Sequence, residues 1–257
     1  MHDLFIAECK RLFMLQIRYP LEFVSGIFML TFVFYSLVLG IRFVAGDSPI
    51  IGGRIDMLVV GYISWLLVSH SVMTVTNQIA DEAKTGTLEG LLLSYHSPGI
   101  IFLLRSLVSA LINGIKTALI LLLVLLLTDV SLNFNIINLL PLITMILAAI
   151  GLGLIAGGAT LLLKRTQTLL APLQFLLMFV VMTPFEQLQN VFSLLSGFLP
   201  ILPSVMLLRQ MMVTGMEPAM TDMLLLLLNA GVYLTIGILV FGRFVAYTKR
   251  KGAIADY

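Results

Sequence analysis

Residues 101–128 read IFLLRSLVSALINGIKTALILLLVLLLT, a run that is apolar apart from Arg105, Lys116 and a few hydroxyl or amide side chains. A helix that crosses the hydrocarbon core of a bilayer needs about 20 predominantly apolar residues. This run exceeds that length, and five further runs of the chain are also long and apolar. The pattern predicts an all-α polytopic membrane protein with six transmembrane helices, at 21–45, 57–78, 101–128, 136–163, 168–185 and 222–246.

Composition points to the same class of protein. Hydrophobic residues make up 60% of the chain and charged residues 11%, whereas soluble domains carry about 25% charged residues. Leucine-rich runs favour helices over a membrane barrel, whose strands would alternate between apolar and polar residues. No basic patch with interleaved aromatic residues indicates nucleic-acid binding. Cys9 is the only cysteine, so neither an intrachain disulfide nor a thiolate metal cluster is expected.

The N-terminal residues 1–20 have the pattern of a helix that lies on the membrane surface. Apolar side chains recur at near-helical spacing, and Glu8, Arg11 and Arg18 collect on another side. Pro20 then interrupts the pattern and lets the chain turn into the bilayer. The alternative is a cytosolic helix that does not touch the membrane.

Orientation follows from the distribution of Lys and Arg, which are enriched in cytoplasmic loops. With the N-terminus inside, eleven of these residues lie on or near the cytoplasmic side, and only Arg42, Arg54 and Arg209 lie outside. Both termini are therefore expected to be cytoplasmic, with the chain as one transmembrane domain of the cell membrane.

Residues 186–210 are also apolar but do not read as a seventh span. Gly197, Pro200 and Pro203 interrupt any continuous helix, and a seventh crossing would place the basic C-terminal residues outside. We predict a re-entrant hairpin that dips in from the outer face between the fifth and sixth spans. Irregular backbone at that depth needs protein or a water-filled cavity around it. The hairpin either caps or lines a translocation path, or it is an apolar plug between helices.

Sequence patterns for energy-yielding or catalytic chemistry are missing. No Lys-Thr or Lys-Ser pair follows the glycine that a GxxxxGK[ST] phosphate-binding loop requires. His2, His70 and His96 are scattered, and neither HExxH nor a Gly-x-Ser-x-Gly elbow occurs. The chain is therefore expected to be no enzyme by itself, with no catalytic, metal or cofactor site.

One charge stands out within a span, at Lys116 in Asn113-Gly114-Ile115-Lys116-Thr117. A lysine at this depth is costly, so it should face a bundle interior, a cavity or a partner subunit. It either contacts an anionic or polar substrate or makes a structural hydrogen bond to a carbonyl or a carboxylate. The candidate path-lining residues are Asn113, Lys116, Glu186, Pro200 and Pro203.

The longest polar stretch, at 79–98, reads IADEAKTGTLEGLLLSYHSP. Thr85 or Thr87 could cap the start of a short helix, and three leucines would share one face of it at spacings of three and four. Acidic residues would remain available to a basic partner. The alternative is an ordinary solvated loop.

This stretch resembles the signature that follows the second span in permease subunits of type-2 ABC exporters (ABC-2 permeases). That family shows a run of acidic and basic residues, then Gly-Thr-Leu-Glu, then two leucines. The layout of spans, hairpin and termini resembles the family over nearly the whole chain. One departure is Ser94-Tyr95, where the family often has Thr-Pro. The residues that match are Asp81, Glu82, Gly86, Thr87, Leu88, Glu89, Leu91 and Leu92.

The resemblance implies that this loop is a coupling helix, which docks into a groove on a separate ATP-binding subunit. ATP and Mg would bind to that subunit, in two copies, and not to this chain. The permease would act as a homodimer with the path between two copies, and spans two and five usually lie at that seam. Membrane lipids would surround it.

The substrate is less constrained. An apolar lining of leucine, methionine and phenylalanine favours an amphipathic drug or a lipid-like compound. Export of a polysaccharide or glycolipid is the alternative within the same family. A self-sufficient channel or ion-coupled carrier would need carboxylates within the spans or a ring of charged residues, and these are scarce.

Overall fold

The computed structural model describes residues 2–45, 49–92, 97–128, 130–161, 167–185 and 197–251. All regular structure within these ranges is helical. The elements in chain order are α1 His2–Arg18, α2 Pro20–Ala45, α3 Pro49–Lys84, α4 Leu88–Leu92, α5 Pro98–Thr128, the 3-10 helix η1 Ile136–Asn138, α6 Leu139–Thr160, α7 Gln167–Met182, α9 Leu202–Thr214 and α10 Met220–Lys251.

Five of these helices are long and apolar enough to cross a membrane, and α7 contributes a shorter apolar helix at Leu170–Met182. The predicted class of an all-α polytopic membrane protein is thus confirmed. The five long segments are Pro20–Val44, Ile55–Lys84, Pro98–Thr128, Ile136–Thr160 and Met220–Arg250.

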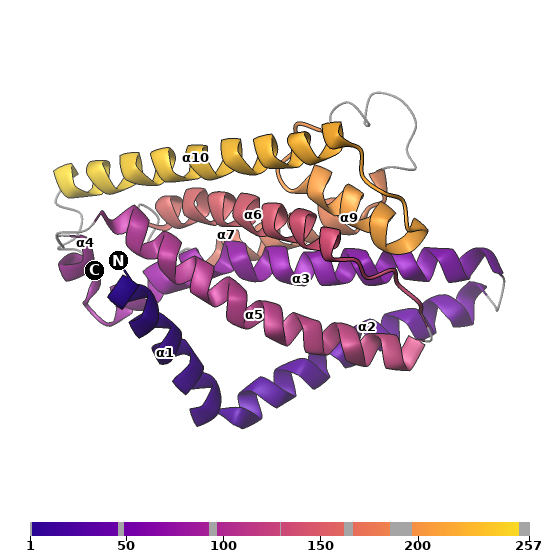
Figure 1. Ribbon diagram of the computed structural model, residues 1–257. Helices are drawn as coiled ribbons and strands as arrows, with labels where there is room; N and C mark the ends of the chain where they lie inside the picture. The colour runs from indigo at the N-terminus through magenta and orange to yellow at the C-terminus, as the bar shows by residue number, and fades with distance from the viewer. Residues whose placement is uncertain are drawn as a thin grey trace.

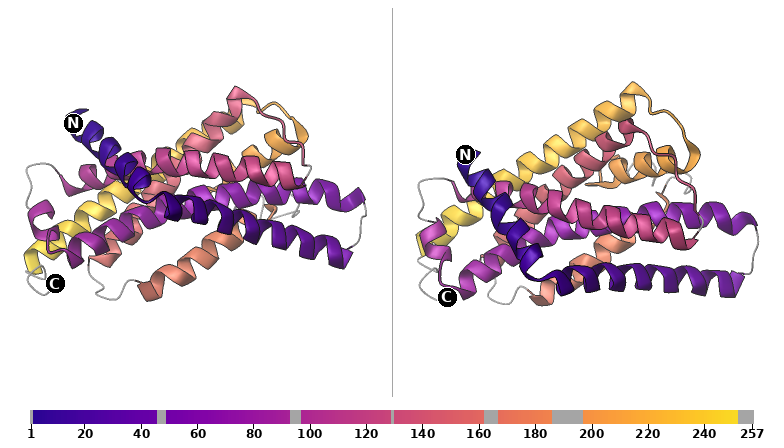
Figure 2. Two further views of the ribbon diagram at one scale, coloured as in Figure 1. Left: turned by 90° about the horizontal axis from the view of Figure 1, so that it is seen from below. Right: turned by 60° about the horizontal axis from the view of Figure 1, so that its bottom comes forward.

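The long helices run roughly along one axis of the molecule, and α1 is inclined to them (Figure 1). Helix α1 ends at Arg18 and α2 begins at Pro20, so the two helices form the sharp corner that the proline predicts. The views in Figure 2 show α2 along one margin of the bundle and α10 on the far side of it. The N-terminus, the C-terminal end of α10 and α4 lie at the same end of the molecule.

Helix α6 is central because glycines let two neighbours approach its backbone closely. An added Cβ at Gly151 would lie 2.4 Å from the carbonyl oxygen of Tyr233 in α10. On another face, an added Cβ at Gly153 would lie 3.0 Å from the carbonyl oxygen of Val72 in α3. Small residues are the usual means by which membrane helices pack at short distances. The α3–α6–α10 layer therefore forms the core on which the other helices rest.

Helix α9 begins within the region predicted as a re-entrant hairpin, 186–210, of which residues 186–196 lie outside the described residues. It begins after Ile201, which has a φ of 73° and is buried, and it continues past residue 210 to Thr214. Gly215, with a φ of 69°, ends it in the left-handed conformation that glycine adopts readily.

Buried Arg209 anchors α9 to the end of α7. Its Nη2 donates to the carbonyl oxygen of Val181 at 2.8 Å, one of the last carbonyls of α7, which have no partner within that helix. Gly61 of α3 leaves room for this guanidinium, because an added Cβ there would lie 3.2 Å from Nη2. The arginine thus joins three helices near one end of the bundle.

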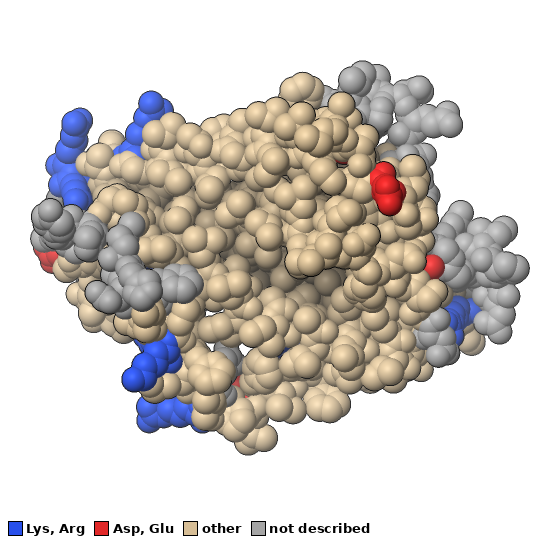
Figure 3. Space-filling model, in the orientation of Figure 1, with Lys and Arg blue, Asp and Glu red and all other residues tan. Residues whose placement is uncertain are grey.

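Charged side chains are segregated on the surface. Figure 3 shows Lys and Arg gathered mainly toward the end that carries both termini, with a broad middle that is almost free of charge on this face. At the opposite end, Arg42 in the last turn of α2 donates from Nη2 to the carbonyl oxygen of Thr128 at 3.2 Å. Two polar ends around an apolar middle are the distribution that a bilayer requires.

Candidate functional site

Helix α3 ends at Lys84 in a tight turn that leads directly into helix α4. Gly86 has a φ of 72°. Its N–H donates to the carbonyl oxygen of Ala83 at 3.2 Å, and the N–H of Thr87 donates to that of Glu82 at 3.0 Å. This pair of hydrogen bonds around a left-handed glycine is a Schellman motif, which ends α3 and redirects the chain. Helix α4, Leu88–Leu92, follows at once.

The threonine hydroxyls bind α3, whereas the sequence suggested that one of them would cap the next helix. Thr85 Oγ1 donates to the carbonyl oxygen of Asp81 at 2.9 Å. Thr87 Oγ1 makes a hydrogen bond to the Glu82 carboxylate, and its carbonyl oxygen accepts from the N–H of Leu91 at 3.1 Å. The hydroxyls therefore fasten the turn to the last turn of α3.

Helix α4 has an inner and an outer side. Leu88 is buried and belongs to a core cluster with Ile79 and Phe102, and partly buried Leu91 packs against the same cluster. Glu89 and Gly90 are exposed, as is Asp81 before the turn. The expected leucine face is therefore present for Leu88 and Leu91, while the side chain of Leu92 lies outside the described residues. An acidic side chain points away from the bundle.

An ionic cluster beneath this turn was not predicted from the sequence. Arg105 of α5 donates from Nε to Oε1 of Glu8 in α1 at 2.8 Å and from Nη1 to Oε1 of Glu82 in α3 at 2.6 Å. Arg11 adds an ion pair to Oε2 of Glu8 at 2.9 Å. The side chains of Arg105, Glu8 and Glu82 are only 14%, 11% and 18% exposed. We name Glu8, Glu82 and Arg105 the ionic cluster; it joins three elements at the base of α4.

The interior polar residues Asn113 and Lys116, one helical turn apart in α5, contact different neighbours. Asn113 donates from Nδ2 to Oγ of Ser109 at 3.1 Å, and Ser109 hydrogen-bonds Thr74 of α3 at 3.3 Å. The ammonium of Lys116 lies 5.8 Å from the centre of the Phe23 ring in α2. Asn113 therefore takes part in the α3–α5 interface, while Lys116 turns toward α2.

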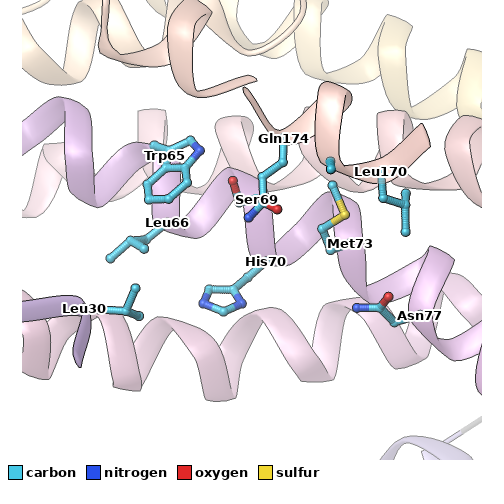
Figure 4. Close-up of a pocket in the computed structure, with 10 residues that line it drawn as sticks. Leu30, Trp65, Leu66, Ser69, His70, Met73, Asn77, Leu170 and Gln174 are labelled. Carbon is cyan, nitrogen blue, oxygen red and sulfur yellow. The ribbon is translucent and has the colours of Figure 1, made fainter. Parts of the chain in front are cut away.

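A cavity of about 420 Å³ opens between α2, α3 and α7. In Figure 4, Trp65 and Gln174 lie on one side of it, and His70 and Leu30 on the other. Leucine, methionine and alanine side chains complete a lining that also holds Ser69 and Asn77. The site can accept a ligand with an apolar body and a few hydrogen-bonding groups.

The remaining predicted path residues lie elsewhere. Pro203 lines a separate cavity of about 260 Å³ between α9 and the start of α10. Pro200 accepts at its carbonyl oxygen from the N–H of Leu202 at 2.8 Å, in the turn before α9. Glu186 lies outside the described residues. The structure therefore does not bring the prolines together with Asn113 and Lys116.

Neither a metal site within the described residues nor a similarity to known proteins identifies the function of this chain. Among the residues that the structure describes, no group of three or more His, Cys, Asp or Glu side chains could hold a metal ion. No protein-family model matches the chain, and no curated protein matches it either.

Proposed function

We propose that this chain is the permease subunit of an ABC exporter, driven by separate ATP-binding subunits that dock on α4. The observation that carries the proposal is the α3–α4 turn. An acidic, exposed helix surface at Glu89 is held rigidly over the ionic cluster, at the end of the bundle that is rich in Lys and Arg. A rigid, charged projection of this kind suits a segment that receives force from a partner.

The proposed topology has six crossings with both termini in the cytoplasm. Five crossings alone would place the N-terminus and the C-terminus on opposite sides of the membrane. Both termini lie at the same end of the molecule, and α7 as a sixth crossing accounts for this. Helix α9 would then be the part of the outer hairpin that returns to the outer face, since Ser204 at its start contacts Thr144 within α6 and Met212 near its end accepts from Asn133 in the loop before α6. The basic end faces the cytoplasm by the positive-inside rule, in the cell membrane.

The proposed path lies between two copies of the chain. The cavity between α2, α3 and α7 supports this arrangement. Beside it, one face of α7 is exposed and apolar, formed by Phe175, Leu176 and Phe179. A second copy of the chain could cover this face. The cargo would be an amphipathic drug or a lipid-like compound. ATP and Mg would bind on the partner subunits, so that this chain supplies the path and the coupling surface.

The left-handed turn at Gly86 gives a first test. Gly86→Ala is expected to weaken coupling, because a residue with a Cβ loses about 1–2 kcal/mol in this conformation. Steric conflict does not contribute, since no atom lies within 4 Å of an added Cβ. Gly86→Asn should retain activity, because asparagine tolerates the left-handed region. Gly90→Ala is the matched control, in an equally open position. The measurement is ATPase activity of the complex; equal activity of all three variants would contradict the proposed role of the turn.

The charge on α4 gives the direct test of the proposed function. The chain is co-expressed with a candidate ABC ATP-binding subunit from the same genome, and co-purification and ATP-driven transport of a fluorescent amphipathic drug in proteoliposomes are measured. Glu89→Arg is expected to abolish both, because it reverses the charge at the docking surface. Glu217→Arg reverses an exposed charge at the other end of the molecule and should change neither. Unaltered complex formation by Glu89→Arg, or ATP-independent uphill transport by the chain alone, would refute the proposal.

A further inference from the structure

Lys116 lies near the middle of the membrane-crossing part of α5. Two polar layers bound that part: Arg105 with Glu8 toward the end with the termini, and the Thr128 carbonyl bound by Arg42 at the other end. At about 1.5 Å per residue, Arg105 and Thr128 are roughly 34 Å apart, close to the hydrocarbon thickness of about 30 Å. Lys116 is 11 residues from the first and 12 from the second, midway along this part of α5, and its ammonium reaches Phe23 and Gly26 in the first two turns of α2.

The described residues offer the Lys116 ammonium an aromatic face but no anion. It lies 5.8 Å from the Phe23 ring centre, and Gly26 provides the space, because an added Cβ there would lie 2.7 Å from Nζ. Glu22 precedes Phe23 but is exposed, and no ion pair joins it to Lys116. A charged group kept at this depth is normally paired or functional, so an anion is needed to complete the site.

Two buried polar atoms in the lining of the neighbouring cavity lack a hydrogen-bond partner within the described residues. Leu30 of α2, one helical turn beyond the Gly26 that lies beside Lys116 Nζ, lines the cavity together with His70 of α3. Trp65 Nε1, which can only donate, and Ser69 Oγ are buried at the same cavity, and neither has a hydrogen-bond partner within the described part of the chain. Such a combination selects a ligand that brings acceptor oxygens and negative charge, together with an apolar body for the leucines of the lining.

We propose that Lys116 binds the acidic head of a single-chain anionic amphiphile, whose apolar tail occupies the cavity beside Trp65. The further step, that this amphiphile is also the transported compound, rests on the proposed function. Binding itself needs no ATP-binding subunit, so failure of the binding test and failure of the docking test are distinguishable.

Trp65 is the only tryptophan of the chain, which makes its fluorescence a direct reporter. The full chain in phosphatidylcholine nanodiscs is titrated with dodecanesulfonate that is brominated on its tail, and with the equally brominated dodecanol. The sulfonate should quench Trp65 saturably and bind at least about tenfold more tightly than the alcohol, because only the sulfonate forms a charge-assisted contact. Equal affinity for the sulfonate and the alcohol would show that the Lys116 ammonium already has an anionic partner within the protein, and would overturn the inference.

Variants locate the charge that binds the sulfonate. Lys116→Met should remove the preference for the sulfonate, and Lys116→Arg should keep it. Gly26→Leu should weaken sulfonate binding without removing a charge, because it fills the space beside Nζ. Lys84→Met is the control, since Lys84 is exposed and paired with Asp81; it should bind as the unaltered chain does. An unchanged preference in Lys116→Met overturns the inference. Full competition by phosphatidylglycerol in the nanodisc would do so as well, by showing that the site takes a lipid headgroup.

Discussion

Gly237→Leu is expected to prevent stable folding. An added Cβ at Gly237 of α10 would lie 2.4 Å from the carbonyl oxygen and 2.7 Å from the Cα of Gly151 in α6. These are backbone atoms, which cannot rotate aside as a side chain can, so the two helices must separate along their contact. Overpacking of a core costs about 1–3 kcal/mol and occasionally more. We expect a loss above the upper end of that range, seen as a large fall in melting temperature or as aggregated protein.

Gly242→Leu is the matched control for this prediction. It makes the same change in the same helix, five residues further on, where no atom lies within 4 Å of an added Cβ. Leucine is also a better helix former than glycine by up to about 1 kcal/mol, so this variant should be at least as stable as the unaltered chain. Thermal unfolding followed by size-exclusion chromatography in detergent measures both. Similar melting temperatures for the two variants would show that the close α6–α10 contact is not needed.

The sequence was informative about the helices because a bilayer imposes one strong requirement on each of them. Hydropathy places the apolar parts of α2, α5, α6 and α10 to within a few residues. It does not place the polar ends. The second span was predicted to end at residue 78, yet α3 continues to Lys84, because its polar last turns still form helical hydrogen bonds and its stop signal is the later Gly86. The fifth was predicted to reach 185, yet α7 ends at Met182, since the residue before Pro184 is disfavoured in a helix.

In the candidate site, too, the sequence indicated local features but not contacts between distant residues. Local patterns predicted a short helix after residues 85–87 and the shared face of Leu88 and Leu91, because both follow from a few consecutive residues. The ionic cluster could not be found in this way, since Arg105 pairs with residues 97 and 23 positions earlier in the chain. Charge patterning alone gives no reason to choose these pairs among the other charges at the same end. The close contact of Gly151 with α10 depends equally on which helices are neighbours, which no single-helix pattern contains.

Arg105→Met is expected to destabilise the fold and to uncouple the proposed transport cycle. The change removes the guanidinium partner of Glu82, which is 18% exposed, whereas Glu8 keeps its ion pair with Arg11. Removing one member of a fully buried ion pair typically costs about 3–5 kcal/mol, because the remaining charge is stranded, and we expect a loss below that range at this part-buried site. Since Glu82 also holds Thr87, the turn into α4 should loosen. The melting temperature of the chain and the number of ATP molecules hydrolysed per substrate transported measure the two effects.

Two comparisons separate the ionic cluster from ordinary surface charge. Lys84→Met removes an ion pair to Asp81 in the same segment, but those side chains are 66% and 70% exposed, and exposed pairs contribute only about 0–1 kcal/mol. It should therefore change neither stability nor coupling measurably. The double variant Arg105→Met with Glu82→Gln should be more stable than Arg105→Met alone, because the stranded carboxylate is neutralised. If the two changes are instead additive, Arg105 and Glu82 do not act as a pair, and the base of α4 is held by its leucines alone.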